Sequence, residues 1–505
     1  MSSIFKGLVA AAAVGLASLR ADVRLPAIFS DHMVLQQKQE CAIWGWASPG
    51  EKVNAAIAGR TRSAEANSAG RWVMKLPALT EPGPYTLTIS GENRITIVDV
   101  LAGEVWLGSG QSNMELTVGQ ARDFAGEKAA ANFPRLRMFK EESPTASSEQ
   151  FVGKGRWVVC SPEVVGRFSA TLYFFGRELH RFLATPVGLI NSSVGGTPIE
   201  SWIPAEAQHG SERLKPFFAE ARIAAANFDA AAAQEKYERE LAAWREAVAA
   251  AKAPRAAPRK PVNLNEVRAR WSDVGGLFNG KIAPLIPFAI RGAVWYQGEA
   301  NAGNDKARFY QYQLPLLVTE WRRRWGYDFP FAWVQLPNFA VSGRDWPLVR
   351  EGMLRSLAVP HTGMTVNIDI GDPHEIHAGN KQEIGRRLSL WALAEVYQHH
   401  EIAWCGPLFA SYEKRDRGIV VRFKHTAGGL VVKSGGLQGF MIAAEDRRWR
   451  PATARVDGDT VIVTSAEILE PVAVRYAWEN NPACSLHNVA GLPASPFRTD
   501  DWPYP

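Results

Sequence analysis

Four short polar segments contain residue types that can carry out nucleophilic chemistry on an ester. The residues of interest are Ser112 in GSGQSNM, Gly195 and Gly196 in SVGGTP, Gln297 and Glu299 in YQGEAN, and His377 in DPHEIH. A serine hydroxyl becomes an effective nucleophile when a neighbouring base accepts its proton, and an imidazole is a common base. The set therefore suits acyl transfer, with Ser112 as the nucleophile and His377 as the base.

The remaining residues of this set suit the stabilisation of negative charge. Attack on an ester carbonyl places charge on the former carbonyl oxygen, and each well-placed donor lowers the barrier by roughly 3–4 kcal/mol. The expected oxyanion donors are the backbone N–H of Ser112, a backbone N–H at Gly195 or Gly196, and the side-chain amide of Gln297. Glycine leaves no side chain to hinder the acyl oxygen. Glu299 is expected to support its loop.

Two other motif interpretations are rejected. The segment GQSNM is not the GxSxG elbow of many hydrolases, because Met114 occupies the position of the last glycine. The segment HEIH spaces His374 and His377 by three residues, whereas the zinc motif HExxH needs four to place both imidazoles on one helix face. We therefore expect neither a metal ion nor a cofactor.

The residues between about 99 and 402 contain the elements that must position these side chains. Apolar stretches typical of buried strands are EVWLG, PVGLINSS, IRGAVWYQ, FPFAWVQL and MTVNIDIG, with helical stretches such as TLYFFGRELHRFL between them. This alternation predicts a parallel sheet covered by helices on both faces. All parallel strands end at the same edge, where ligands bind in open α/β sheets. The polar segments are therefore expected to meet at that edge.

The two ends of the chain have a different pattern. Residues 22–98 and 403–505 alternate apolar and polar positions between frequent turn residues, which predicts an N-terminal and a C-terminal β-sandwich domain around the catalytic domain 99–402. An Ala-, Glu- and Lys-rich stretch at about 205–260 predicts a helical insertion in the catalytic domain.

The first residues and the overall composition limit the location and the partners. Residues 1–21 have Lys6 followed by an apolar run and small residues, the pattern of a signal peptide, so we expect a secreted or periplasmic protein with no membrane span after cleavage. The formal net charge of +6 over 505 residues is not concentrated in a basic patch, so nucleic-acid binding is not expected. The four cysteines form no CxxC pair, which excludes a zinc ribbon.

These residues resemble the sialate O-acetylesterase family of the SGNH/GDSL hydrolases. The resemblance rests on EVWLGSGQSNME, SSVGGTPIESW, GAVWYQGEANA, DPHEIHAGNKQEIGRRL, LPAIFSDHMVLQ and NVAGLPASPFRTDDW, which together extend over nearly the whole mature chain. It implies an SGNH-type three-layer α/β/α domain with a parallel sheet, flanked by the two β-sandwich domains. It also implies that Ser112 is the nucleophile, that His377 is the base, and that Gln297 stands where the superfamily often has an asparagine oxyanion donor.

The sequence departs from the superfamily at the acid that orients the histidine. The superfamily commonly has an aspartate three residues before the base, but that position is His374 here. Glu375 and Asp372 are equally weighted candidates, since side chains two apart in extended chain share a side and Asp372 requires the loop to fold back. Glu299 is a third candidate, and a Ser–His dyad without an acid would also work, more weakly.

The expected function is that of a secreted carbohydrate O-acetylesterase, a serine carboxylic-ester hydrolase whose partner is an acetylated sugar. Sialic acid, xylan and xyloglucan all remain open as the acetylated sugar. The alternatives are an esterase for longer acyl chains and a carbohydrate-binding protein with a decayed site, which the eighteen tryptophans and the β-sandwich domains suggest. Oligomeric state stays open.

Overall fold

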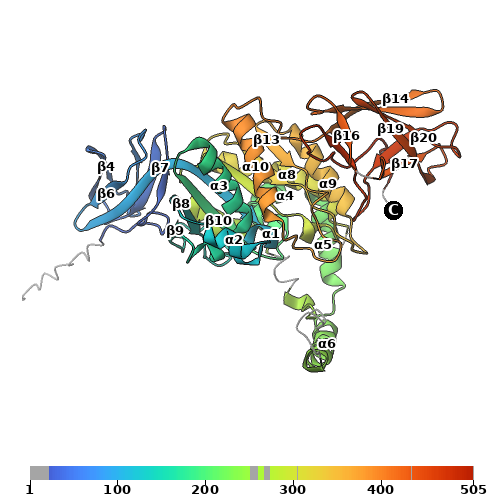
Figure 1. Cartoon of the computed structure of the whole chain (residues 1–505). Helices are drawn as coiled ribbons and strands as arrows, with labels where there is room; N and C mark the ends of the chain where they lie inside the picture. Colours follow the sequence, from blue (N-terminus) through green and yellow to red (C-terminus); the bar gives the residue numbers. More distant parts are fainter. Residues whose placement is uncertain (1–21, 251–259, 267–272, 304, 434, 504–505) are drawn as a thin grey trace, which may run out of the picture.

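The computed structural model describes residues 22–250, 260–266, 273–303, 305–433 and 435–503. Strand-rich parts at the two ends of the chain lie on either side of an α/β centre (Figure 1). The predicted signal peptide, residues 1–21, lies outside the described residues. Among the helices that the structure describes, none combines the length and apolar character needed to cross a membrane.

A mixed sheet forms the centre of the molecule. Its strands lie in the order β13-β12-β11-β7-β10-β8-β9, and neighbours run parallel from β13 to β8, whereas β9 is antiparallel to β8. The bounds are β7 (Arg94–Gly110), β8 (Phe133–Lys140), β9 (Trp157–Cys160), β10 (Val187–Ser193), β11 (Gly292–Tyr296), β12 (Phe331–Val334) and β13 (Thr362–Thr365). The predicted parallel sheet is thus mixed, because β9 returns from β8 at the edge.

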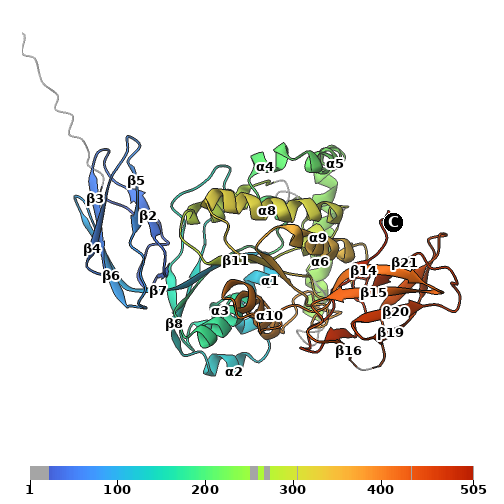
Figure 2. The same cartoon turned by 90° about the horizontal axis from the view of Figure 1, so that it is seen from above.

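Helices lie on both sides of this sheet. In Figure 2, α8 (Tyr310–Trp325) lies on one side of β11, and α3 (Ala170–Leu183) and α10 (Lys381–Trp391) lie on the other. The α3 and α10 helices touch closely, because a Cβ on Gly385 would come within 2.5 Å of the Phe174 Cβ. The helix α9 (Trp346–Arg355) packs against α8, and the short helices α1 (Ser112–Glu115) and α2 (Phe124–Ala129) follow β7.

The long strand β7 joins the N-terminal part to the centre. Its first half pairs with β6 and β1, and its second half pairs with β10 and β11. The domain boundary predicted at residues 98–99 therefore falls inside one continuous strand. The other N-terminal strands are β1 (Val34–Gln36), β2 (Cys41–Trp46), β3 (Lys52–Ile57), β4 (Arg60–Glu65), β5 (Arg71–Leu76) and β6 (Tyr85–Ser90).

The described part of the stretch predicted as a helical insertion includes the α-helices α4 (Ala205–Gly210), α5 (Lys215–Ala226) and α6 (Ala230–Ala250). None of the α6 residues is buried, and Figure 1 shows α6 projecting from the molecule. Its side chains therefore contribute nothing to the core. Residues 251–259 of the predicted insertion lie outside the described residues.

The C-terminal part consists of short antiparallel strands in three sheets, ordered β14-β15-β20-β19, β18-β17-β21-β23 and β16-β22. The bounds are β14 (Leu408–Arg415), β15 (Gly418–Lys424), β16 (Leu430–Val432), β17 (Phe440–Ala443), β18 (Trp449–Pro451), β19 (Thr453–Asp457), β20 (Thr460–Thr464), β21 (Ala473–Tyr476), β22 (Leu486–Asn488) and β23 (Phe497–Arg498).

Tryptophans form much of the central core. Among the described residues, seven tryptophans are fully buried, namely Trp106, Trp202, Trp295, Trp321, Trp333, Trp346 and Trp391. Several touch edge to face, such as the rings of Trp202 and Trp295, whose centroids lie 6.0 Å apart. Much of the tryptophan content is therefore core packing, and the residue count alone is no argument for a sugar-binding surface.

Candidate active site

Ser112 lies where β7 ends and α1 begins. Gly110 has φ +137°, and a Cβ there would lie 2.1 Å from the backbone oxygen of Tyr296, so only glycine lets β7 pass this close to β11. The register pairs Gly110 with both Ser193 and Tyr296. The chain segments after β7, β10 and β11 therefore begin side by side, which places the half-buried Ser112 beside the other two segments.

The imidazole of His377 lies against the Ser112 hydroxyl. The distance from His377 Nε2 to Ser112 Oγ is 3.0 Å, and His377 Nδ1 lies 3.2 Å from Glu375 Oε1. The same Glu375 oxygen accepts the His377 backbone N–H at 2.9 Å. Asp372 instead accepts the backbone N–H of His374 at 2.8 Å, and within the described residues it forms neither a hydrogen bond nor an ion pair with His377. Hydroxyl, imidazole and carboxylate thus lie in a row that can supply a nucleophile, a base and an orienting acid.

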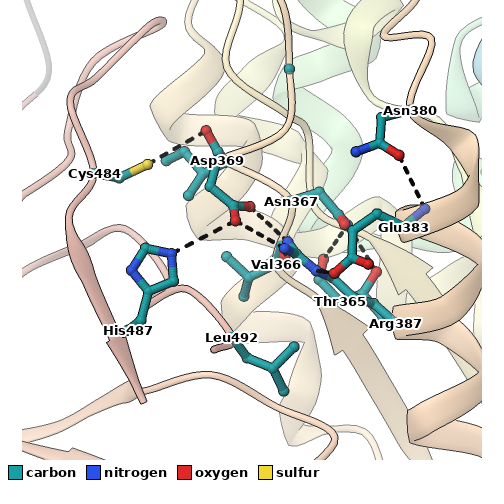
Figure 3. A network of polar contacts seen from close by, with 12 residues as sticks. Thr365, Val366, Asn367, Asp369, Asn380, Glu383, Arg387, Cys484, His487 and Leu492 are labelled. Carbon is teal, nitrogen blue, oxygen red and sulfur yellow. Dashed lines mark hydrogen bonds and ion pairs between the residues drawn. The ribbon is translucent and has the colours of Figure 1, made fainter. Parts of the chain in front are cut away.

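The loop that carries His377 is anchored at its base by charged side chains. The strand β13 ends at Thr365, so most of the predicted strand MTVNIDIG belongs to this loop. Figure 3 shows Asp369 between Arg387 and His487, with Arg387 donating to both carboxylate oxygens at 2.7 and 2.9 Å and His487 Nε2 3.7 Å away. Burial opposes ionisation of Asp369, but Arg387 and His487 outweigh it and hold the pKa of Asp369 below its usual range. The anchor therefore ties the loop to α10 and to β22.

The backbone donors near Ser112 differ in their availability. The Gly195 N–H donates to Glu115 Oε2 at 2.8 Å, so it is already occupied. Within the described part of the chain, no acceptor is found for the backbone N–H of Ser112 or of Gly196, whose φ is +70°. A Cβ on Gly195 would lie 3.4 Å from the Ser112 Cβ, which shows how closely this loop approaches the hydroxyl.

The side chain of Gln297 lies in a buried network. It is fully buried, and its Nε2 lies within hydrogen-bond distance of Gln111 Oε1 (3.1 Å), the Thr197 backbone oxygen (3.2 Å) and Asn301 Oδ1 (2.7 Å). Tyr310 donates its hydroxyl to the Gln297 side-chain oxygen at 3.1 Å. The amide of Gln297 is thus engaged inside the protein, so it would have to give up an acceptor before it could bind an oxyanion.

Asn113, next to Ser112, connects the neighbouring loops. Its Nδ2 donates to Glu299 Oε1 at 2.6 Å and to the Ile376 backbone oxygen at 3.1 Å, and its Oδ1 accepts from Lys381 Nζ at 2.5 Å. Burial raises the pKa of Glu299, although Asn113 and the charges of Lys381 and His377 act in the opposite direction. Burial lowers the pKa of Lys381 to about 7 against the opposing charge of Glu299. Glu299 therefore contacts Asn113 at this edge.

Three of these residues were not among the predicted site residues. Asn113 and Glu115 lie within the quoted segment EVWLGSGQSNME, and Lys381 lies within the quoted segment DPHEIHAGNKQEIGRRL, but none of the three was assigned a role. Lys381 is the first residue of α10 and is fully buried. Its position at the start of a helix that carries apolar residues was the feature of the sequence that could have pointed to it.

The other candidate chemistry groups are placed differently. Among the residues that the structure describes, no group of three or more His, Cys, Asp or Glu side chains could hold a metal ion. The HEIH segment lies in a loop, so its histidines do not share a helix face. All four cysteines are free, and Cys41, Cys160 and Cys405 are buried.

Comparisons with known proteins place this site in context. A family model described as carbohydrate esterase, sialic acid-specific acetylesterase matches residues 278–393, a range that includes Gln297, Glu299 and His377. The crystal structure of a carbohydrate acetylesterase from Xanthomonas citri is 35% identical, covers 95% of this chain and 100% of its own, and superposes with a TM-score of 0.80. The sialate O-acetylesterases of Rattus norvegicus and Homo sapiens are each 27% identical over 94% of this chain and 94% and 92% of their own lengths.

Proposed function

This chain belongs to the sialate O-acetylesterase family of carbohydrate esterases, and we propose that it removes acetyl groups from sugar hydroxyls by covalent catalysis at Ser112. The main support for the proposal is the 3.0 Å distance between His377 Nε2 and Ser112 Oγ, together with Glu375, whose carboxylate lies 3.2 Å from His377 Nδ1. The α/β centre then acts as an SGNH-type catalytic domain, between β-sandwich domains at both ends.

The first half of the reaction forms an acetyl-enzyme. Ser112 Oγ attacks the acetyl carbonyl while His377 Nε2 accepts the hydroxyl proton, and Glu375 stabilises the imidazolium that results. The oxyanion accepts hydrogen bonds from the backbone N–H groups of Ser112 and Gly196. Glu115 accepts the Gly195 N–H and thereby keeps the Gly195 loop close to Ser112. The C–O bond to the sugar then breaks, and His377 returns its proton to the departing sugar oxygen.

The second half releases acetate. Water attacks the acetyl group on Ser112 and gives its proton to His377, and the tetrahedral intermediate uses the same donors. Ser112 leaves with a proton from His377, and free enzyme and acetate remain. His377 thus mediates every proton transfer that the two steps require, and Glu375 stabilises the imidazolium.

The family supports our proposal for the substrate, and the first residues of the chain support our proposal for the location. Acetylated sialic acid is our first choice, and acetylated xylan or xyloglucan is the alternative, because the relatives named above act on acetylated carbohydrates. The predicted signal peptide supports a secreted or periplasmic enzyme.

The test measures acetate release from acetylated sialic acid, acetylated xylan and p-nitrophenyl acetate. We expect the wild-type enzyme to release acetate and Ser112→Ala to lose at least about a thousandfold in kcat, as when a nucleophile is removed. A Ser112→Ala variant with full activity would exclude the proposal. Sugar binding without labelling of Ser112 by a serine-directed phosphonate would favour a binding protein with a decayed site instead.

A further inference from the structure

Two ionisable side chains, one basic and one acidic, are buried around Asn113, the residue that follows Ser112. Lys381 is fully buried and Glu299 is 3% exposed. The two groups form no direct ion pair among the described contacts, and the Asn113 amide lies between them, accepting from Lys381 Nζ and donating to Glu299 Oε1. The Lys381 ammonium also lies 5.2 Å from the centre of the Tyr296 ring. The ammonium is thus held by one amide oxygen and one aromatic face.

We propose that Lys381 and Glu299 are positioning residues for the esterase reaction, which act as a charge-balanced pair through Asn113 to hold the His377 loop against Ser112. This inference rests on the proposed function. Neither side chain touches the reacting atoms, so neither is a catalytic residue.

The contacts of Asn113 show how one amide fixes three segments. Its backbone follows Ser112 at the start of α1, and its two N–H groups point to Glu299, in the turn after β11, and to the oxygen of Ile376, which precedes His377. Its oxygen accepts from Lys381, the first residue of α10. Thr171 adds a hydrogen bond to the Asn113 backbone oxygen at 3.1 Å. Rotation of this amide would therefore release the residue before His377.

The two charges make this orientation of the amide the favoured one. A carboxylate accepts from the N–H side and an ammonium donates to the oxygen side, so reversing the amide would oppose both charges. Burial penalises each charge alone: it lowers the pKa of Lys381 to about 7 and raises the pKa of Glu299. Removing one partner leaves the other as an uncompensated buried charge, whereas removing both does not.

The experiment compares kcat and KM for K381M, E299Q and the double variant K381M/E299Q on p-nitrophenyl acetate. We expect each single variant to lose about 10- to 100-fold in kcat with KM changed less than about threefold, because small displacements of reacting groups cost this much. The double variant should have a higher kcat than either single variant, since it carries no unpaired buried charge. A simple structural defect would not be relieved by a second substitution.

K281M serves as the matched control. Lys281 is also buried, but its Nζ donates to the backbone oxygens of Glu141 and Ser143, away from Asn113. We expect K281M to lower the thermal midpoint while kcat stays within about threefold of the wild type, because folded molecules keep the site. If K381M does not fold, the inference is still tested by comparing the kcat of the double variant with the kcat of E299Q.

Wild-type kcat in K381M or E299Q, or a double variant whose loss is the product of the two single losses, would overturn the inference. Ser112→Ala is measured in the same series. If Ser112→Ala is inactive and K381M is fully active, only this inference is refuted. If Ser112→Ala is fully active, the proposed function itself is refuted.

Discussion

Replacing Glu375 with glutamine tests whether the carboxylate beside His377 contributes to the reaction. Glu375 Oε1 lies 3.2 Å from His377 Nδ1 and also accepts the His377 backbone N–H. The substitution removes the charge and keeps the size and the acceptor. It therefore changes the stabilisation of the imidazolium while the loop conformation is retained.

The expected magnitude follows from the exposure of the pair. A buried acid in a serine protease triad contributes about 10⁴-fold to kcat. Here the side chains of His377 and Glu375 are 39% and 52% exposed, so solvent screens their attraction. We expect E375Q to lose about 10- to 100-fold in kcat, which equals about 1.4–2.7 kcal/mol of transition-state stabilisation.

The assay is the initial rate of p-nitrophenyl acetate hydrolysis for wild type, E375Q and D372N. D372N is the matched control, because Asp372 lies in the same loop but accepts the backbone N–H of His374, an interaction that an asparagine oxygen retains, and not that of His377. We expect D372N to stay within about twofold of the wild type. Added salt should reduce the gap between wild type and E375Q, since the ion pair is partly exposed.

Two results would refute this reasoning. A larger loss in D372N than in E375Q would mean that Asp372 orients the histidine in the working enzyme. Wild-type rates in E375Q would mean that Ser112 and His377 act as a dyad, with no carboxylate contribution.

Three further substitutions test how the edge is built. G110A should lower the free energy of unfolding by about 3 kcal/mol or more, because a Cβ would lie 2.1 Å from the Tyr296 oxygen at φ +137°; normal stability in urea would contradict this. Q297A should lower it by about 2–4 kcal/mol, since Asn301 and Tyr310 lose a buried partner; a loss of kcat with unchanged stability would instead favour an oxyanion role. The stability gap between wild type and D369N should shrink by about 1 kcal/mol from pH 7 to pH 3, because a carboxylate with a lowered pKa contributes fully above the unfolded value of 3.8 and less as pH falls; a gap independent of pH would contradict this.

The arrangement of strands could be predicted from sequence to a large extent. The apolar stretches PVGLINSS and GAVWY contain the residues that form β10 and β11, and EVWLG lies within the second half of the long strand β7. The carboxyl edge of parallel strands brings Ser112, Gly195 and Gln297 near one another, as geometry requires. The family resemblance is confirmed by the comparisons.

Side-chain partners could not be predicted because they depend on loop conformation. Glu375 and Asp372 were equal candidates in the sequence, and only the folded loop brings Glu375 to His377. The sequence predicts that the amide of Gln297 is a free donor, but in the fold this amide donates to buried acceptors. The role of Lys381 could not be predicted from the sequence, because its hydrogen-bond partner Asn113 lies far away in the chain.

Detection of an acetyl-enzyme would test covalent catalysis at Ser112 directly. Wild-type protein and Ser112→Ala are mixed with p-nitrophenyl acetate, quenched in acid within one turnover, digested and mapped by mass spectrometry. We expect one acetyl group on the peptide that contains Ser112 in the wild type and none on the corresponding peptide of Ser112→Ala, which should release almost no acetate. Equal acetate release by both proteins, with no acetyl group on that peptide, would contradict this mechanism.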